Sequence, residues 1–286
     1  QGPPSSILRK LINGKFVSDD GSIGENVHSD LADLRALLTE AELEEYRHLG
    51  AMAAYAMQSA LDAIEQGDTE AEIAARLVAA GTGCGFHVPV YLIAADDRIA
   101  KYRHPLPTLN PITDDQAPAH RVDRYVMVVG GFQRDGLNVS ITRFKRFVDL
   151  GPELDDAYER ICCVDALMQE ATRPGETLGA VFEACQRAYV QYALAENEWH
   201  NPHQGGVTGY GARVAKGAPG STFRILDKTW ATQLCNTFDK DIVLGQAYAW
   251  NPSAPGVKSE DTFLLLPDGS REIITSTPKT PAIDLA

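Results

Sequence analysis

The sequence predicts an α+β fold made of two similar halves, each with two helices followed by strands. Helical spacing of apolar residues gives way to strand-like runs in the middle of the chain, and the same change occurs again near its end. The two helix breaks also resemble each other: each places a glycine two residues before a threonine, in "EQGDTEAE" (65–72) and "RPGETLGA" (173–180). Two ordinary capped helices would give the same local match, but the repeated order of elements favours an internal duplication.

The first half begins with two helices, which end at about residues 65 and 80. Each starts with a capping box, in which a threonine and a glutamate three residues later satisfy the first backbone N–H groups: Thr39 with Glu42, and Thr69 with Glu72. Apolar residues follow at helical spacing, and Gly67 separates the two helices. Strands are then expected at 88–94, 124–130 and 137–148. A long loop, 95–121, joins the first two, and Asp135-Gly136 marks the turn before the third.

The second half repeats this plan. Residues 153–171 carry apolar side chains on one helical face, Pro174-Gly175 breaks the run, and a further helix extends from Thr177 to about Ala195. A Gly-rich loop then leads to four short strands, at 222–226, 242–250, 261–266 and 271–275.

The length and composition favour one large domain. The chain has 286 residues, of which 44% are hydrophobic and 23% charged, an ordinary globular mixture with ample material for a core. We expect residues 31–286 to form a single domain. Residues 1–30 would be a partly ordered arm, preceded by a tag remnant, Gln1-Gly2-Pro3.

Charge and cysteine usage narrow the choice of partners. The formal net charge of −13 disfavours nucleic acid, because an acidic surface repels phosphate. No apolar run has the length that a bilayer requires, and no secretory signal is visible. Five cysteines without a CxxC pair indicate neither structural zinc nor a disulfide framework. We therefore expect a cytoplasmic protein with reduced thiols and no nucleic-acid or membrane partner.

Three segments carry residues suited to chemistry. In "KYRHPLPT" (101–108), prolines stiffen a loop that contains His104, which titrates near neutral pH; a plain surface histidine is the alternative. In "WHNPHQGGVTGYG" (199–211), glycines let the backbone approach a ligand beside His200 and His203; a flexible linker is the alternative. In "AWNPSAPGVKSEDT" (249–262), amide, lysine and acidic side chains surround a turn that could equally be a solvated hairpin tip.

In this order, the segments resemble the pita-bread fold of the creatinase, prolidase and methionine aminopeptidase superfamily, over about residues 36–276. "HQGG" (203–206) partly matches a His-Gly-x-Gly segment, and Gln204 departs from it. "GVKSEDT" (256–262) is similar to Gly-Val-Arg-x-Glu-Asp-Thr, with Lys258 in place of arginine. The resemblance implies a single pita-bread catalytic domain, pseudo-twofold halves, a curved antiparallel sheet and a homodimer.

The resemblance also implies where metal ligands would fall. Metallopeptidases of this superfamily hold two metal ions with two Asp, one His and two Glu. Carried over, these positions are Val129, Ser140, His203, Asn251 and Glu260. The hairpin "VGGFQRDGLNVSITR" (129–143) keeps the layout but places its only acid, Asp135, at the turn. One imidazole and one carboxylate are a poor site for two hard cations, so we expect no metal ion and no cofactor.

Creatinase resembles this chain in lacking a working metal site, and it hydrolyses a small C–N bond with a histidine. "HPLP" places His104 where the superfamily has a non-ligand active-site histidine. The leading hypothesis is a metal-independent hydrolase or lyase, in which His104 is the general acid or base while His203 and Glu260 orient the substrate or relay a proton. The substrate would be small, polar and amino-acid-like, and the reaction C–N hydrolysis, elimination or cyclisation. Candidate substrate-binding residues are Ser140, Asn251, Tyr210, Arg213, Lys258 and Tyr102.

Two alternatives remain open. The chain can be a non-catalytic binding module that has lost its ligands. It can also be a peptidase with a single metal ion, in which His203, Glu260 and either His104 or His200 bind one zinc with an open position.

Overall fold

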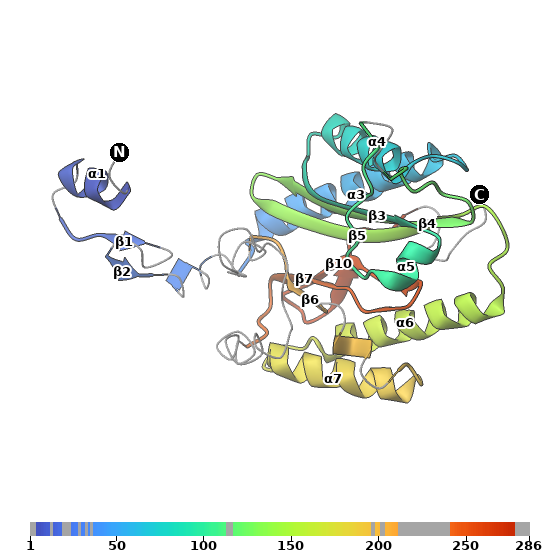
Figure 1. The fold of residues 1–286 in the computed structure, drawn as a ribbon. Helices are drawn as coiled ribbons and strands as arrows, with labels where there is room; N and C mark the ends of the chain where they lie inside the picture. Colours follow the sequence, from blue (N-terminus) through green and yellow to red (C-terminus); the bar gives the residue numbers. More distant parts are fainter. Residues whose placement is uncertain are drawn as a thin grey trace.

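The computed structural model arranges the chain as strands between two pairs of helices. Figure 1 shows α3 and α4 on one side of the strand layer and α6 and α7 on the other. The structure describes residues 4–11, 14–18, 24–27, 30–31, 34, 37–112, 117–195, 198–200, 204–210 and 241–277.

The first half follows the expected order closely. Both predicted capping boxes are present, at the starts of α3 (Glu40–Asp62) and α4 (Glu70–Gly83). Three antiparallel strands follow in the spatial order β3-β4-β5: β3 (His87–Ala95), β4 (Tyr125–Arg134) and β5 (Leu137–Arg146). The β4–β5 turn is Asp135-Gly136, where both residues adopt positive φ, as a tight hairpin turn requires.

The second half has the same plan with shorter strands. Its helices are α6 (Pro152–Ala171) and α7 (Leu178–Gln191). An antiparallel sheet in the order β11-β10-β7-β6 follows, made of β6 (Gly205–Val207), β7 (Gln246–Trp250), β10 (Asp261–Leu265) and β11 (Arg271–Ile273). Between β7 and β10 lies a small hairpin of β8 (Ser253–Ala254) and β9 (Val257–Lys258).

The two helix breaks are equivalent in their hydrogen bonding, which supports the duplication. Gly67 and Gly175 have φ angles of 94° and 85°. The N–H of Gly67 donates to the carbonyl of Val122 at 2.8 Å, and the N–H of Gly175 donates to that of Ile242 at 3.0 Å. In each half the partner residue, Val122 or Ile242, donates back to the carbonyl of the residue that follows the glycine. Each helix break is therefore hydrogen-bonded to the segment just before a strand, β4 or β7.

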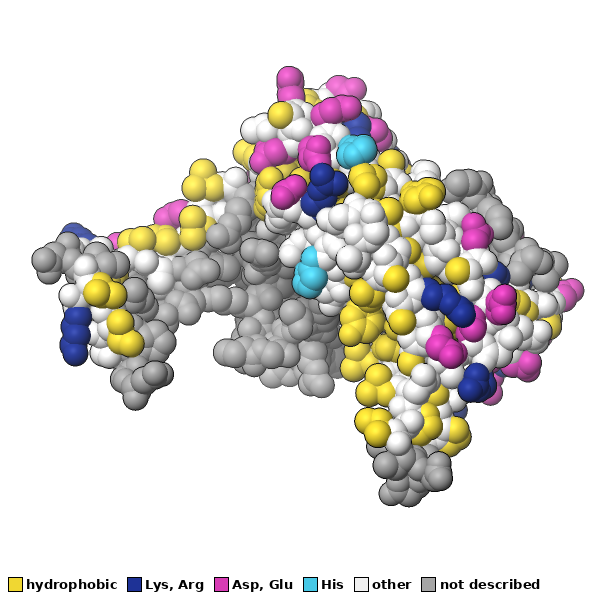
Figure 2. Space-filling model, turned by 90° about the horizontal axis from the view of Figure 1, so that it is seen from above, with side chains coloured by type: hydrophobic (Ala, Val, Ile, Leu, Met, Phe, Trp, Pro, Cys, Tyr) yellow, Lys and Arg dark blue, Asp and Glu magenta, His cyan; other side chains and the backbone are white. Residues whose placement is uncertain are grey.

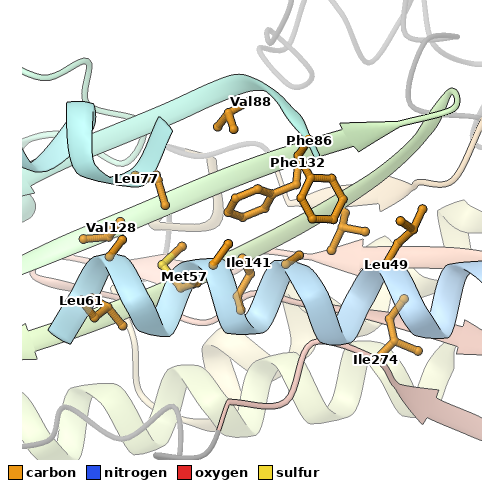
Figure 3. Close-up of a cluster of buried hydrophobic side chains, with 14 of the residues drawn as sticks. Leu49, Met57, Leu61, Leu77, Phe86, Val88, Val128, Phe132, Ile141 and Ile274 are labelled. Atoms are coloured by element: carbon orange, nitrogen blue, oxygen red, sulfur yellow. The ribbon is translucent and has the colours of Figure 1, made fainter. Parts of the chain in front are cut away.

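Two hydrophobic clusters fill the space on either side of the strands. Because side chains alternate along a strand, β4 contributes to both: Val126 and Val128 enter the cluster under α3 and α4, whereas Met127 enters the cluster over α6 and α7. Figure 3 shows part of the first cluster, where Met57 of α3 lies near Ile141 of β5. The clusters therefore share the strand layer as a common wall.

Several elements differ from the sequence expectation. The loop 95–121 contains a helix, α5 (Asp97–Lys101), which is too short to show helical periodicity. The arm contains α1 (Pro4–Leu11) and the two-residue strands β1 (Val17–Ser18) and β2 (Glu25–Asn26). The strand expected at 242–250 begins at Gln246, because the residues before it pair with the helix break instead. The strand expected at 222–226 lies outside the described residues.

The surface of the described residues is charged and mixed. Figure 2 shows acidic side chains interspersed with lysine and arginine on the face above α3 and α4, with no continuous basic area on that face. None of the helices in the described part of the chain combines the length and apolar composition that crossing a membrane requires.

Candidate active site

Glu260 is a buried carboxylate held by neighbours on other strands. The residue lies just after β9 in the sequence and is buried, with 5% of its surface exposed. The hydroxyl of Thr142 donates to Oε2 at 2.5 Å, and the side-chain amide of Asn251 donates to Oε1 at 3.3 Å. The backbone N–H of Thr142 also donates to the Glu260 carbonyl at 3.1 Å. The carboxylate is thus fixed between β5 and the end of β7.

Lys258 lies beside this carboxylate and faces a histidine. Only 1% of the residue is exposed. Its Nζ atom is 3.7 Å from Oε2 of Glu260 and 3.1 Å from Nε2 of His104. Burial lowers the pKa of the Lys258 ammonium, and the nearby Glu260 carboxylate opposes that shift. The lysine therefore connects the buried carboxylate to His104, which is 154 residues away in the sequence.

His104 reaches this position on a braced loop. It is half-buried in the segment after α5, next to the buried Pro105. The preceding Arg103 donates through Nε to Oε1 of Glu198 at 2.9 Å, and both of these side chains are almost fully buried. Glu198 belongs to a short 3₁₀ helix, Glu198–His200, so an ion pair ties the His104 loop to the segment after α7.

A cavity of about 400 Å³ opens at this loop. Among the described residues its walls are Lys101, Tyr102, Arg103 and His104. This volume is in the range of small-molecule sites. Tyr102 is half exposed and has the guanidinium of Arg98 over its ring, 5.4 Å from the centroid. The cavity wall thus combines cations, an aromatic ring and an imidazole.

The hairpin β4–β5 carries two other predicted positions, Val129 and Ser140, as well as Thr142, which bonds the carboxylate. Val129 is 4% exposed and belongs to the cluster over α6 and α7, directly opposite Thr142 in the strand register. Ser140 is half-buried, and its backbone N–H and carbonyl both bond the hydroxyl of Thr262 on β10. Thr142 did not emerge from the sequence, although its position two residues after Ser140 places it on the same strand face.

A second buried acid lies behind the site on α6. Asp165 is 4% exposed and accepts a bond from the hydroxyl of Ser259 at 2.5 Å. Burial raises the pKa of this carboxyl to about 7. Asp261 is instead neutralised by the buried guanidinium of Arg143, at 2.7 Å. Sequence reasoning missed Asp165, because a single acid on an amphipathic helix carries no signal of burial.

The other predicted site residues are not all brought to this cluster. Tyr210 packs at the β4–β5 turn, where its ring approaches Gly136, and its surroundings are those of the cluster under α3 and α4. His203 and Arg213 lie outside the described residues.

The described donor set does not fit a dinuclear metal centre. Both Glu260 oxygens accept bonds from protein donors, and a lysine ammonium stands 3.7 Å from one of them. Val129 offers no donor atom, and Ser140 and Asn251 bring no negative charge. Among the residues that the structure describes, no three His, Cys, Asp or Glu side chains are close enough to share a metal ion.

Comparison with known proteins identifies the fold. No family model matches the chain, and no curated protein matches it in sequence. Solved structures do match. The prolidase from Pyrococcus furiosus has a TM-score of 0.67 at 18% identity over 90% of this chain and 70% of its own. The X-Pro aminopeptidase from Thermotoga maritima gives 0.69 at 16% identity, over 98% of this chain and 79% of its own. The Xaa-Pro dipeptidase from Bacillus anthracis gives 0.69 at 17% identity, over 98% and 76%.

These matches extend over 90–98% of this chain, and at 16–18% identity they show a shared fold. The resemblance inferred from "HPLP", "HQGG" and "GVKSEDT" is confirmed at the level of the fold. The chain has the pita-bread fold.

Proposed function

We propose that this protein is a metal-independent pita-bread enzyme that acts on a small, polar, amino-acid-like substrate, with His104 as its general acid or base. The observation that carries the proposal is the position of His104. It lines a cavity of about 400 Å³, and its Nε2 atom contacts the buried Lys258 at 3.1 Å. A histidine placed between a cavity and a buried charged pair is suited to proton transfer.

The reaction class is C–N bond cleavage, by hydrolysis or by elimination or cyclisation. The structural neighbours support it, because their names describe prolidases, X-Pro aminopeptidases and dipeptidases, which are peptidases. The donor set disfavours the dinuclear version of that chemistry, since three of the five carried-over ligand positions are Val129, Ser140 and Asn251.

Each residue of the cluster has a part in this proposal. His104 gives a proton to the departing nitrogen, or takes one from an attacking water. Glu260 balances the charge of Lys258 behind the ring. Lys101 brings positive charge to the cavity wall and suits a substrate carboxylate. Arg213 is retained as a second candidate for binding that carboxylate. His203 is retained as a candidate partner of the substrate.

A peptidase with one metal ion is the second candidate. The names of the structural neighbours favour it, and His203 would have to join Glu260 and His104 as a ligand. In that arrangement Lys258 would have to leave Glu260, because an ammonium competes with a cation for the same oxygen atom.

Metal content separates the two candidates. We would grow cells with Mn, Fe, Co and Zn and measure bound metal in the purified protein by elemental mass spectrometry. The proposal expects less than about a tenth of an equivalent, because tight sites keep their metal through purification. One firm equivalent, lost together with activity on chelation, would overturn it in favour of the single-metal peptidase.

Activity tests the role of His104. Xaa-Pro dipeptides and N-acyl or N-carbamoyl amino acids form the substrate panel, and each is assayed with the wild type, His104→Ala and His48→Ala. His48 is exposed on α3 and serves as the matched control. His104→Ala should lower kcat by about 100-fold or more, and His48→Ala should leave it unchanged. If His104→Ala kept its activity, His104 would not be the general acid or base of the reaction.

A further inference from the structure

The contact between Lys258 and His104 determines which ring nitrogen carries the proton. Oε1 of Glu260 accepts from an amide N–H₂ group of Asn251, and Oε2 accepts from the hydroxyl of Thr142. A carboxylate surrounded by donors is suited to the ionised form. A buried carboxylate needs a compensating cation, and the described cation beside it is Lys258, at 3.7 Å.

Lys258 as an ammonium can only donate. It has three N–H groups and no lone pair, so the 3.1 Å contact requires Nε2 of His104 to be the acceptor. An imidazole whose Nε2 accepts a bond carries its proton on Nδ1 and is neutral. We propose that Lys258 is a positioning residue that fixes His104 as the neutral tautomer protonated on Nδ1.

The surrounding charges are compatible with this assignment. On its own loop His104 has two cationic neighbours in sequence, Lys101 and Arg103, and the latter is neutralised by Glu198 across the loop. From the strand side it faces Lys258, with Glu260 behind. The group in contact with Nε2 is therefore a cation, which opposes a second proton on the ring.

The tautomer has a chemical consequence, which rests on the function proposed above. The Nδ1–H bond of His104 breaks as its proton passes to the departing nitrogen, and Nε2 takes one proton from Nζ of Lys258. Two N–H bonds break and two form, and the ammonium becomes an amine. Burial of Lys258 disfavours its charged form and so favours this transfer, whereas the Glu260 carboxylate favours the ammonium and opposes it. A proton returned from solvent restores the pair.

Nitrogen-15 NMR of the histidine rings tests the assignment without any substrate. Long-range ¹H–¹⁵N spectra distinguish the two neutral tautomers and the imidazolium, and His104→Gln identifies the His104 signals. We would compare the wild type with Lys258→Arg and Lys258→Met at pH 5 to 8. Lys258→Met alone leaves Glu260 as a buried unpaired charge, so the double variant Lys258→Met/Glu260→Gln keeps the test valid if the single one does not fold.

In the wild type we expect the Nδ1–H tautomer throughout this range. Lys258→Arg should keep it, because a guanidinium also donates without accepting. Lys258→Met and the double variant should lose the preference and let the ring become charged toward pH 5. A wild-type ring protonated on Nε2, or a tautomer that survives loss of Lys258, would overturn the proposal.

Kinetics with an active substrate then separate positioning from the proposed function. Lys258→Arg should keep the tautomer yet lower kcat by about 10-fold or more with little change in KM, because arginine stays protonated. If Lys258→Arg kept the kcat of the wild type, the proposed proton transfer from Lys258 would be wrong. An inactive wild type with the expected tautomer would count against the proposed function and leave the tautomer assignment standing.

Discussion

At the scale of single residues, Asp165 stands out among the described carboxyls, because its surroundings oppose its charge. Burial raises its pKa from 3.8 to about 7, and Asp261 and Glu260 add to the shift, whereas bonds from Ser259 and Gln169 oppose it. The folded protein therefore holds this proton more tightly than the unfolded chain does. Between pH 4 and 7 the native state binds more protons, so stability falls as pH rises through that window.

Asp165→Asn should remove this pH dependence. The amide keeps an oxygen for the Ser259 hydroxyl but cannot ionise. We expect the variant to gain stability over the wild type on going from pH 5 to pH 8, by roughly 2–3 kcal/mol at most. Urea unfolding at both pH values measures this, with the exposed Glu159→Gln on the same helix as control. Parallel pH profiles for Asp165→Asn and the wild type would show that Asp165 ionises normally.

At the scale of elements, the strand β6 depends on one glycine. Gly205 has a φ angle of 89°, and a Cβ atom built on it would lie 2.0 Å from the carbonyl oxygen of Ala249 on β7. An alanine at this position would combine an unfavourable positive φ with this clash. The clash cannot be relieved without separating β6 from β7, because it involves the backbone of β7. Gly206 differs, since a Cβ there would meet nothing within 4 Å.

Gly205→Ala and Gly206→Ala therefore form a matched pair. The first should destabilise the fold by about 2 kcal/mol or more and increase hydrogen exchange at Val207, whose strand is displaced. The second should stay within about 1 kcal/mol of the wild type. Equal effects from the two substitutions would mean that the β6–β7 pairing adjusts freely to a side chain.

The same elements show what the sequence could predict. Thr39 and Thr69 start their helices as expected, because a capping box is a local signal within four residues. The helix α5 was missed because five residues are too few to show a period. His104 and Glu260 were found through short motifs.

The contact that joins those two residues was not predictable. Lys258 and His104 are 154 residues apart, and their approach depends on how the two halves pack. The burial of Thr142 and Asp165 has the same origin, since each faces the site only after β5 and α6 have packed against β9 and β10. Local patterns therefore predicted most of the elements and led to the candidates His104 and Glu260, but not to the bonds around them.

At the scale of the whole molecule, the two hydrophobic clusters share their strands. β4 sends Val128 into one cluster and Met127 into the other, and β10 divides Leu264 and Phe263 in the same way. If either cluster is lost, one face of these strands becomes exposed, and the strands that support the other cluster lose half of their packing. The two halves of the duplication should therefore unfold together, although a chain of this length can unfold in steps.

Leu77→Ala in α4 and Ile161→Ala in α6 test this coupling. Both side chains are fully buried, one in each cluster, and each substitution should lower the free energy of unfolding by about 2–5 kcal/mol. In scanning calorimetry both should shift one common transition of the purified protein, and Val190→Ala, exposed on α7, should leave it in place. Two transitions, each shifted by only one of the variants, would show that the halves keep separate stabilities despite their shared strands. A common shift would mean instead that the contact between His104 and Lys258, which joins a loop of the first half to a strand of the second, is lost in the same cooperative transition.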